Sequence, residues 1–499
     1  MSSPRRRNLL RLLAILAATA LLWAVLLPFI ASDNVRMDSD RMFFHADEAM
    51  SQYLREGRGG LVLLLRLFGL TRWDPLRSGI LFLLFFSASS WLFCFFLYRR
   101  ACWKNEGLCL LFFLLYACSQ IWLFHAYFVL QIAGVGFGML LCTLAAGGDA
   151  ACLAGREERK SLRVLREILS LAALSFSLTV YQSLILHYLA VLAVLMFAHF
   201  LREGKDALKS RPFLLSLSLI ALRILLSLAI YYLVARLTRG DADSGNVAAQ
   251  FKWGTDSVWH CLYRILQEIG ATMILYQSRY FSLFPLAAVL GFLLWRRHRS
   301  LPLLLTGLLL LLLPFALSFF LGNVTVPRSQ FVLQAVAAFV PVCFLAESPK
   351  PLRWLRVVCV CTVVLQVALS LRLVHTDNRR NEVDTSAGQR ILSELEPLDP
   401  EKPLVFLGNL KLEDSSLLVE HTDVFGRTFF DWIYEEDKPY RSTRPGIRLL
   451  RALSDRDFQP ASSSLMKKAA KKAAKEDQPA YPAPGFVRET DRYILIRLE

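Results

Sequence analysis

Residues 5–30 read RRRNLLRLLAILAATALLWAVLLPFI, a cluster of arginines followed by a long apolar run. A helix needs about 20 mostly apolar residues to cross the hydrocarbon core of a bilayer. The apolar region of a secretory signal peptide is shorter, roughly 7–15 residues. Because the run from Leu9 to Ile30 is longer than that and further apolar runs follow it, we predict an uncleaved first membrane-spanning helix.

The composition of the whole chain also favours a membrane protein. Of its 499 residues, 55% are hydrophobic and 20% are charged, whereas soluble domains average about 45–50% and about 25%. These values exclude a chain that is disordered throughout and argue against a water-soluble globule. The 57 Lys and Arg residues exceed the 41 Asp and Glu residues, which gives a formal net charge of +16. In a soluble protein this excess would suggest a nucleic-acid partner, but in a membrane protein it is typical of cytoplasmic loops.

Eleven segments are long and apolar enough to be candidate membrane-spanning helices. They are residues 9–30, 78–98, 107–124, 129–149, 165–180, 183–201, 212–235, 280–295, 301–321, 329–346 and 355–374. We place a turn at Tyr181-Gln182, because one helix over 165–201 would far exceed the bilayer core. If the N-terminus is cytoplasmic, every short cytoplasmic loop is basic, as the positive-inside rule requires. These loops contain Arg5–Arg7, Arg99–Lys104, Arg156–Arg166, Arg202–Arg211, Arg296–Arg299 and Lys350–Arg356.

The predicted fold class is therefore an α-helical polytopic membrane protein with a small C-terminal α/β domain outside the membrane. The membrane domain covers residues 1–375 and has two long outside loops, 31–77 and 237–279. In these loops we predict an interfacial or re-entrant helix over Leu61–Leu70 and a surface helix within 251–270. In the outside domain, 376–499, we predict buried strands at PLVFLG (403–408) and YILIRLE (493–499), and a solvated helix or linker at MKKAAKKAAKE (466–476).

The first outside loop is the best candidate for a catalytic site, because it combines carboxylates with arginines. Between residues 33 and 58 it contains the carboxylates, arginines and histidine Asp33, Arg36, Asp38, Asp40, Arg41, His45, Asp47, Glu48, Arg55, Glu56 and Arg58. A carboxylate could accept a proton from an attacking hydroxyl, and arginines could bind a phosphate. The alternative is an ordinary solvated loop that connects two helices.

Asp38-Ser39-Asp40 forms a DxD string, which binds a divalent metal in enzymes that use nucleotide sugars. Because this string lies outside, where nucleotide sugars are not supplied, we favour a catalytic carboxylate and predict no metal or other cofactor. Two nearby carboxylates can differ in pKa, which would help one of them act as a base. Next to them, Gly57-Arg58-Gly59-Gly60 is either a flexible anion-binding turn or a plain loop-to-helix junction.

Further polar residues lie at the predicted outside ends of helices. Tyr181 and Gln182 form a hairpin tip, His125 lies at another tip, and Arg328 opens the tenth segment. Each could line a site, or could be an interface residue, a helix cap or a snorkelling cation. Arg223 lies inside the seventh segment and is expected to face the interior of the bundle. The sequence contains no P-loop, GxSxG or HExxH motif, which argues against an ATP-driven pump, a serine hydrolase and a zincin.

In this order and topology, four stretches resemble the bacterial glucosyl transferase type-II family, which is related to phage serotype-converting O-antigen glucosyl transferases. The first is the acidic pair Asp38/Asp40 followed by Gly57-Arg58, although the chain has DSD and GRGG where adjacent acids and an aromatic after GR are common. The others are SLTVYQSLIL (177–186), PRSQFVLQ (327–334), and the tail with FGRTFFDW (425–432) and the ending PAPGFVRETDRYILIRLE. The likeness runs from about residue 35 to the C-terminus.

The resemblance implies a GT-C-like enzyme of the bacterial inner membrane with its site on the periplasmic side. Such an enzyme moves a glucosyl group from a polyprenyl-phosphate donor to an envelope glycan such as lipopolysaccharide O-antigen. Asp40 or Asp38 would be the base, and Arg58 and Arg328, with Arg41 beside the acidic pair, would bind phosphate. Tyr181 and Gln182, with His125 and His45 nearby, would line the sugar or acceptor site.

Three alternatives to this function stay open from the sequence. An O-antigen polymerase is the nearest, because it is also an enzyme of envelope glycans. A lipid-linked oligosaccharide flippase or transporter would be expected to show internal repeats and paired ionisable groups at mid-membrane. A non-enzymatic envelope assembly protein would act through its tail. The donor sugar, the linkage and the oligomeric state do not follow from the sequence.

Overall fold

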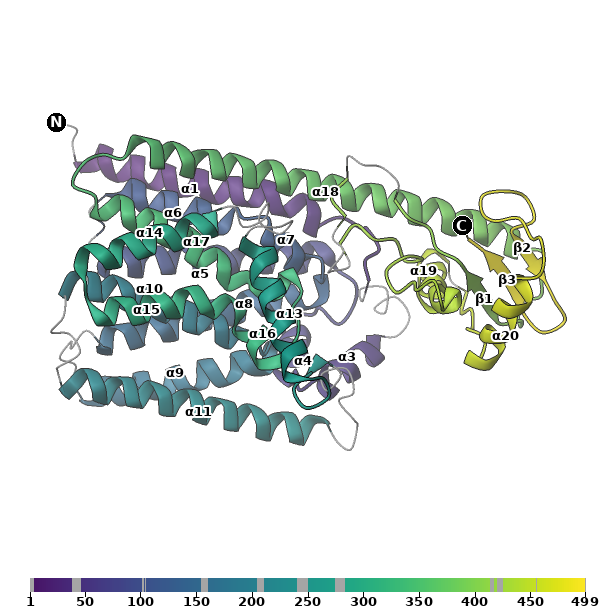
Figure 1. The fold of residues 1–499 in the computed structure, drawn as a ribbon, viewed down its shortest axis with the longest axis horizontal. Coiled ribbons are helices and arrows are strands. Elements are labelled where there is room, and N and C mark those ends of the chain that lie inside the picture. The colour runs from purple at the N-terminus through teal and green to yellow at the C-terminus, as the bar shows by residue number, and fades with distance from the viewer. Residues whose placement is uncertain are drawn as a thin grey trace. The chain divides into compact units, whose positions relative to one another are not determined.

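Helices make up most of the chain in the computed structural model (Figure 1). The structure describes residues 4–37, 46–100, 103, 105–153, 160–203, 211–239, 250–273, 283–412, 417–419, 425–454 and 456–498. The chain forms two compact units. The first comprises Met1–Ala31, Met50–Leu70 and Asp74–Ser370, and the second comprises Ser32–Ala49, Thr71–Trp73 and Leu371–Glu499.

The first unit is a bundle of helices. Its helices are α1 (Pro4–Ile30), α4 (Gly59–Leu67), α5 (Pro75–Arg100), α6 (Glu106–Ala117), α7 (Ile121–Ala126), α8 (Val129–Leu153), α9 (Lys160–Val180), α10 (Leu184–Glu203), α11 (Arg211–Arg239), α13 (Val258–Met273), α14 (Leu283–His298), α15 (Leu301–Leu312), α16 (Ala316–Leu321) and α17 (Phe331–Glu347). Short 3-10 helices lie at Leu313–Phe315 and Pro327–Gln330. Two helices, α3 (Ala46–Arg55) and α18 (Arg353–Leu395), have residues in both units.

Seven helical segments within the described ranges are long and apolar enough to cross a membrane. They are α1, α5, α8, α10, α11, α18 and the continuous run from α15 to α16. Helices of this length satisfy their own backbone hydrogen bonds, which is the condition for crossing a bilayer. The chain is therefore a helical polytopic membrane protein, and the count of eleven crossings stays a prediction.

The predicted segments are helical over most of their described length, but two of them are interrupted. The segment 107–124 consists of α6 and α7, with a break at Cys118–Gln120 where Ile121 N donates to the hydroxyl of Ser119 at 3.4 Å. The segment 301–321 changes to a 3-10 turn at Leu313–Phe315 before α16 begins. Pro314 lies in this turn and has no backbone N–H to continue the α-helical pattern.

The centre of the first unit is α8, which packs against α5, α9, α10 and α11. Its glycines allow this close packing. A Cβ atom at Gly147 would overlap the ring of Phe96 on α5, and one at Gly138 would overlap Leu184 on α10. Small residues at helix interfaces let membrane helices approach closely, because no hydrophobic effect drives them together inside the bilayer.

Arg223 of α11 faces the interior of the bundle, as predicted. It is 4% exposed and forms ion pairs with Asp149 of α8 and Glu167 of α9. Asp149 also accepts a hydrogen bond from the hydroxyl of Tyr188. The buried cation is therefore matched by carboxylates on two neighbouring helices, which is how membrane bundles retain ionisable side chains.

The second unit contains a three-stranded sheet with the order β1-β3-β2. Both predicted strands are present, as β1 (Leu404–Leu407) and β3 (Ile494–Arg497), and they pair in parallel. The third strand, β2 (Val487–Glu489), pairs with β3 in the antiparallel direction. Gly408 follows β1 with a φ of 94°, a conformation that favours glycine and ends the strand.

The Lys/Ala run is a helix, α20 (Ser463–Ala473), and not a linker. The side chain of Ser462 caps its first turn by accepting from Leu465 N at 3.3 Å. Met466 and Ala469 are buried against the sheet, whereas its lysines are exposed. A second helix, α19 (Thr443–Leu453), packs on β1. The domain around these elements is therefore of the α/β type.

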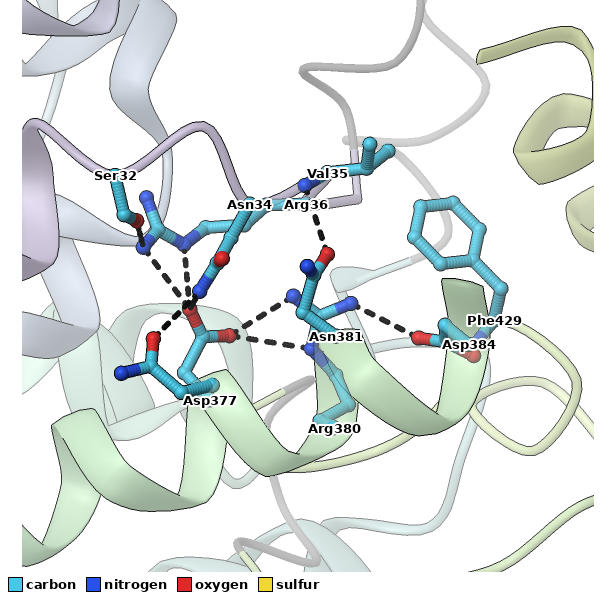
Figure 2. Close-up of polar contacts among 10 residues, drawn as sticks. Ser32, Asn34, Val35, Arg36, Asp377, Arg380, Asn381, Asp384 and Phe429 are labelled. Atoms are coloured by element: carbon cyan, nitrogen blue, oxygen red, sulfur yellow. Dashed lines mark hydrogen bonds and ion pairs between the residues drawn. The ribbon is translucent and has the colours of Figure 1, made fainter. Parts of the chain in front are cut away.

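A fully buried ionic cluster joins three parts of the second unit (Figure 2). Asp377 on α18 accepts from Arg36 Nε at 3.0 Å and from Arg380 Nε at 3.1 Å. Asp384 accepts from Arg380 Nη1 at 2.9 Å and from Phe429 N at 3.1 Å. The four ionic side chains are 0% exposed and their charges balance. Since removing one partner of a buried pair typically costs about 3–5 kcal/mol, this cluster fixes residue 36 and residue 429 on α18.

Candidate functional site

The structure describes five of the nine predicted site residues. These are Arg58, His125, Tyr181, Gln182 and Arg328. The other four, Asp38, Asp40, Arg41 and His45, lie outside the described residues. Helices α4, α7, α13 and α16 gather at one end of the helical bundle in Figure 1, and the described site residues lie on or next to α4, α7, α9 and the turn before α17.

Arg58 lies in a partly buried cage of aromatic and polar side chains. Its Nη1 donates to Gln131 Oε1 at 2.8 Å, and its Nε lies 3.3 Å from Glu56 Oε2. The guanidinium carbon is 5.1 Å from the centre of the Tyr181 ring and 5.9 Å from that of Tyr53. Aromatic faces and a carboxylate stabilise a guanidinium without occupying all of its donors. The side chain is 20% exposed, so an anion can still reach it.

The GRGG motif forms a tight turn between α3 and α4. Gly57 has a φ of 76°, which favours glycine. A Cβ atom at Gly60 would overlap the hydroxyl of Thr179, so glycine is also needed for α4 to pack on α9. The backbone N–H groups of Gly57 and Arg58 donate within the turn, to Leu54 O at 2.9 Å and Tyr53 O at 2.8 Å. These two amides are therefore not available to an anion, whereas the Arg58 side chain is partly exposed.

Gln182 ties the α9–α10 hairpin to the GRGG turn. Its Nε2 donates to the backbone oxygen of Glu56 at 2.8 Å and to the hydroxyl of Tyr231 at 3.0 Å. Both of its N–H groups are thus engaged by the protein. In this structure Gln182 supports the turn that carries Arg58, while the neighbouring Tyr181 contacts the arginine directly.

His125 connects the Arg58 cage to Arg328. Its ring centre is 6.1 Å from that of Tyr181, and the side chain is 4% exposed. Burial lowers the pKa of His125 to about 3, and the charge of Arg328 adds to this effect. The imidazole is therefore neutral at physiological pH, and it can line a site but cannot supply a positive charge.

Arg328 lies in the 3-10 turn that precedes α17. Its guanidinium carbon is 4.3 Å from the centre of the Phe128 ring, and the side chain is partly exposed. A hydrogen bond also links His125 to the backbone of Arg328. A continuous series of contacts therefore runs from Arg58 through Tyr181 and His125 to Arg328, four residues that are far apart in the sequence. Two guanidinium groups beside aromatic and amide side chains can bind a phosphate through charge-assisted hydrogen bonds.

Five further residues contribute to this region. Tyr53, Glu56, Phe128, Gln131 and Tyr231 contact the predicted residues directly. Glu56 belongs to the ionisable residues that the sequence indicates in the first outside loop, and Gln131 follows the helix end at His125, whereas Tyr53, Phe128 and Tyr231 were not predicted. In the part of the chain that the structure describes, no group of three or more His, Cys, Asp or Glu side chains could hold a metal ion.

Together, the fold and the site define a class: a polytopic helical membrane protein with arginine and aromatic side chains gathered at one end of its bundle. The family model described as Glucosyl transferase GtrII matches residues 27–345. The match covers more than half of the chain, which therefore belongs to this family of glucosyl transferases, as the sequence motifs predicted. A comparison with curated proteins gives no match. The matched range includes all five described site residues, and it ends before the tail motifs.

Proposed function

We propose that this protein transfers a hexosyl group from a polyprenyl-phosphate donor to an envelope glycan. Because the chain belongs to a family of glucosyl transferases, we assign the hexose as glucose. The acceptor is a glycan such as lipopolysaccharide O-antigen, and transfer occurs on the periplasmic side of the bacterial inner membrane. The observation that carries the proposal is the series of contacts from Arg58 to Arg328 in a chain of the glucosyl transferase family. The N-terminus is cytoplasmic and the α/β domain periplasmic in this account.

The donor phosphate is the group that the two arginines recognise. In the reaction, the bond between the anomeric carbon and the phosphate oxygen breaks, so negative charge develops on the leaving phosphate. Arg58 and Arg328, with Arg41, stabilise that charge, which is the type of interaction that contributes most to many enzymatic rates. The isoprenoid chain of the donor remains among the apolar helices. No metal is needed, because the arginines supply the positive charge.

The acceptor hydroxyl attacks the anomeric carbon and gives its proton to a carboxylate. We assign this base to Asp40 or Asp38, the acidic pair of the first outside loop. Tyr181, Gln182, His125 and His45 line the sugar or acceptor site in the proposal. For His125, a neutral ring suits hydrogen bonding and stacking, and excludes a role as the cation that holds the phosphate.

Structural analysis of the surface polysaccharide in a deletion strain tests this function. We expect the strain to lose one side-branch hexose while the polysaccharide keeps its normal chain length, and we expect the wild-type gene on a plasmid to restore it. Shortened chains would instead indicate a polymerase, and accumulation of lipid-linked units on the cytoplasmic side would indicate a flippase. A polysaccharide identical to that of the parent strain would contradict the proposal.

A further inference from the structure

A buried carboxylate lies behind the segment that carries Arg328. Glu268 shares the buried face of α13 with Cys261 and Ile265 and is 1% exposed. The opposite face of this helix is apolar and exposed, with Trp259 and Tyr263 among its residues. An ionisable group on the inner face of such a helix is costly unless hydrogen bonds compensate for the loss of water.

Four donors surround the Glu268 carboxylate. One oxygen accepts from the backbone N of Thr325 at 2.9 Å and from the hydroxyl of Ser318. The other accepts from the hydroxyl of Thr325 and from Nε2 of Gln330. Two carboxylate oxygens offer about four acceptor sites, so this donor set matches the ionised form of the side chain. Burial raises the pKa of Glu268, and these hydrogen bonds oppose the rise.

The segment that Glu268 holds contains Arg328. Thr325 is three residues before the arginine and Gln330 is two residues after it, so both flanks bind one carboxylate. Ser329 N also donates to Val326 O at 2.8 Å, which closes the turn between the flanks. Since the two anchor points lie on either side of Arg328, the backbone between them has little freedom to move.

We propose that Glu268 is a positioning residue for the transfer reaction: it fixes residues 325–330 so that Arg328 faces the donor phosphate. The inference rests on the role that the proposed function gives to Arg328. Glu268 itself does not touch the donor, because its oxygens are occupied by the protein. Glu268 acts through the turn at residues 325–330. Replacing Glu268 therefore displaces the guanidinium group of Arg328 without changing the arginine itself.

The Glu268→Gln variant tests this role with almost no change in side-chain size. In glutamine, an NH2 group replaces one of the two carboxylate oxygens. Its N–H groups would face the N–H or O–H donors of Thr325 or Gln330, so the hydrogen bonds to that oxygen would be lost. A displacement of about 1 Å in a positioning group can cost about a hundredfold in rate. We therefore expect kcat/KM for polyprenyl-phosphate glucose to fall about a hundredfold. The matched control Glu203→Gln, at an exposed position of α10, is expected to behave as wild type.

A double variant separates positioning from an independent effect. If Glu268 acts through Arg328, Glu268→Gln combined with Arg328→Ala transfers no more slowly than Arg328→Ala alone. If the double variant is slower than Arg328→Ala by the full factor that Glu268→Gln costs in the wild-type background, the two residues act independently and the proposal is overturned. If Glu268→Gln does not accumulate in the membrane, Thr325→Val removes a single hydroxyl donor, and we expect a loss of about tenfold. Wild-type kcat/KM in that variant would also overturn it.

Hydrogen–deuterium exchange of the purified full-length protein tests the same proposal without the reaction. We expect Glu268→Gln to speed the exchange of the amides in residues 325–330, while the peptides of α8 exchange as in wild type. Unchanged exchange at 325–330 would overturn the positioning role. If wild-type protein does not transfer glucose at all, the proposed function fails, and the exchange measurement still decides whether Glu268 fixes this turn.

Discussion

Replacing the catalytic carboxylate of the first outside loop is expected to reduce glucose transfer by about a thousandfold. An asparagine at the position of the base cannot accept the proton of the acceptor hydroxyl, so the nucleophile is not activated. Since Asp40 and Asp38 are both candidates, both single variants, Asp40→Asn and Asp38→Asn, are needed. The measurement is the rate of glucose transfer by each variant after purification, at matched protein concentration.

Asp47→Asn is the matched control for this prediction. Asp47 belongs to the same outside loop, lies in the first turn of α3 and is exposed, so its variant is expected to transfer glucose at the wild-type rate. All three variants should reach wild-type levels in the membrane, because the changes remove charge without adding volume. Wild-type transfer by both Asp38→Asn and Asp40→Asn would contradict a first-loop base.

Replacing Arg58 is expected to have the second large effect. The side chain combines a hydrogen bond to Gln131 with stacking on Tyr181, and alanine provides neither. Removing one group that stabilises charge in a transition state typically costs about 10²–10³ in rate. We expect Arg58→Ala to lower kcat by about that factor and to raise KM for the lipid-linked donor. Steady-state kinetics with varied donor concentration give both values.

Two further variants, Arg58→Lys and Arg66→Ala, test whether the loss of rate is specific to the guanidinium group of Arg58. Lysine keeps the charge but cannot bind phosphate with two parallel N–H groups or stack in the same way, so we expect an intermediate loss. Arg66 is on α4, the helix that follows Arg58, and is exposed, so its alanine variant should retain wild-type kinetics. Wild-type kcat/KM in Arg58→Ala would remove Arg58 from the phosphate site.

Most of the helical architecture follows from the sequence. Apolar runs of about 20 residues predict membrane helices because the bilayer core sets their length. The strand at 404–407 is also predictable, since it is a short apolar run that ends at Gly408. The break between α6 and α7 was missed, because apolar residues continue on both sides of it and the side chain of the N-cap residue, Gln120, makes no capping hydrogen bond at the start of α7.

The ionic cluster on α18 could not be predicted. Arg36 and Asp377 are 341 positions apart, and neither has a neighbour in sequence that indicates its partner. Arg380 and Asp384 have the spacing of a surface ion pair on a helix, yet both are fully buried. Burial of this kind depends on which segments pack on the helix, and that information is tertiary.

For the candidate site, the sequence predicted the individual motifs but not their contacts. Charged and aromatic residues at helix ends indicate Arg58, Tyr181 and Arg328 separately, and only the fold brings them into one series. Glu268 was missed because it lies in an amphipathic helix, where glutamate usually faces solvent. A signal was present: Cys261, Ile265, Glu268 and Thr272 follow the 3.6-residue period, which places Glu268 on the apolar face.

The most direct test of the central claim is glucose transfer by the purified full-length protein in liposomes. The reaction contains radiolabelled polyprenyl-phosphate glucose and polysaccharide from the deletion strain as acceptor, and a parallel reaction contains UDP-glucose in place of the lipid-linked donor. We predict that label enters the polysaccharide from the lipid-linked donor and that none enters from UDP-glucose. Transfer from UDP-glucose alone, or no transfer from the lipid-linked donor, would contradict the account.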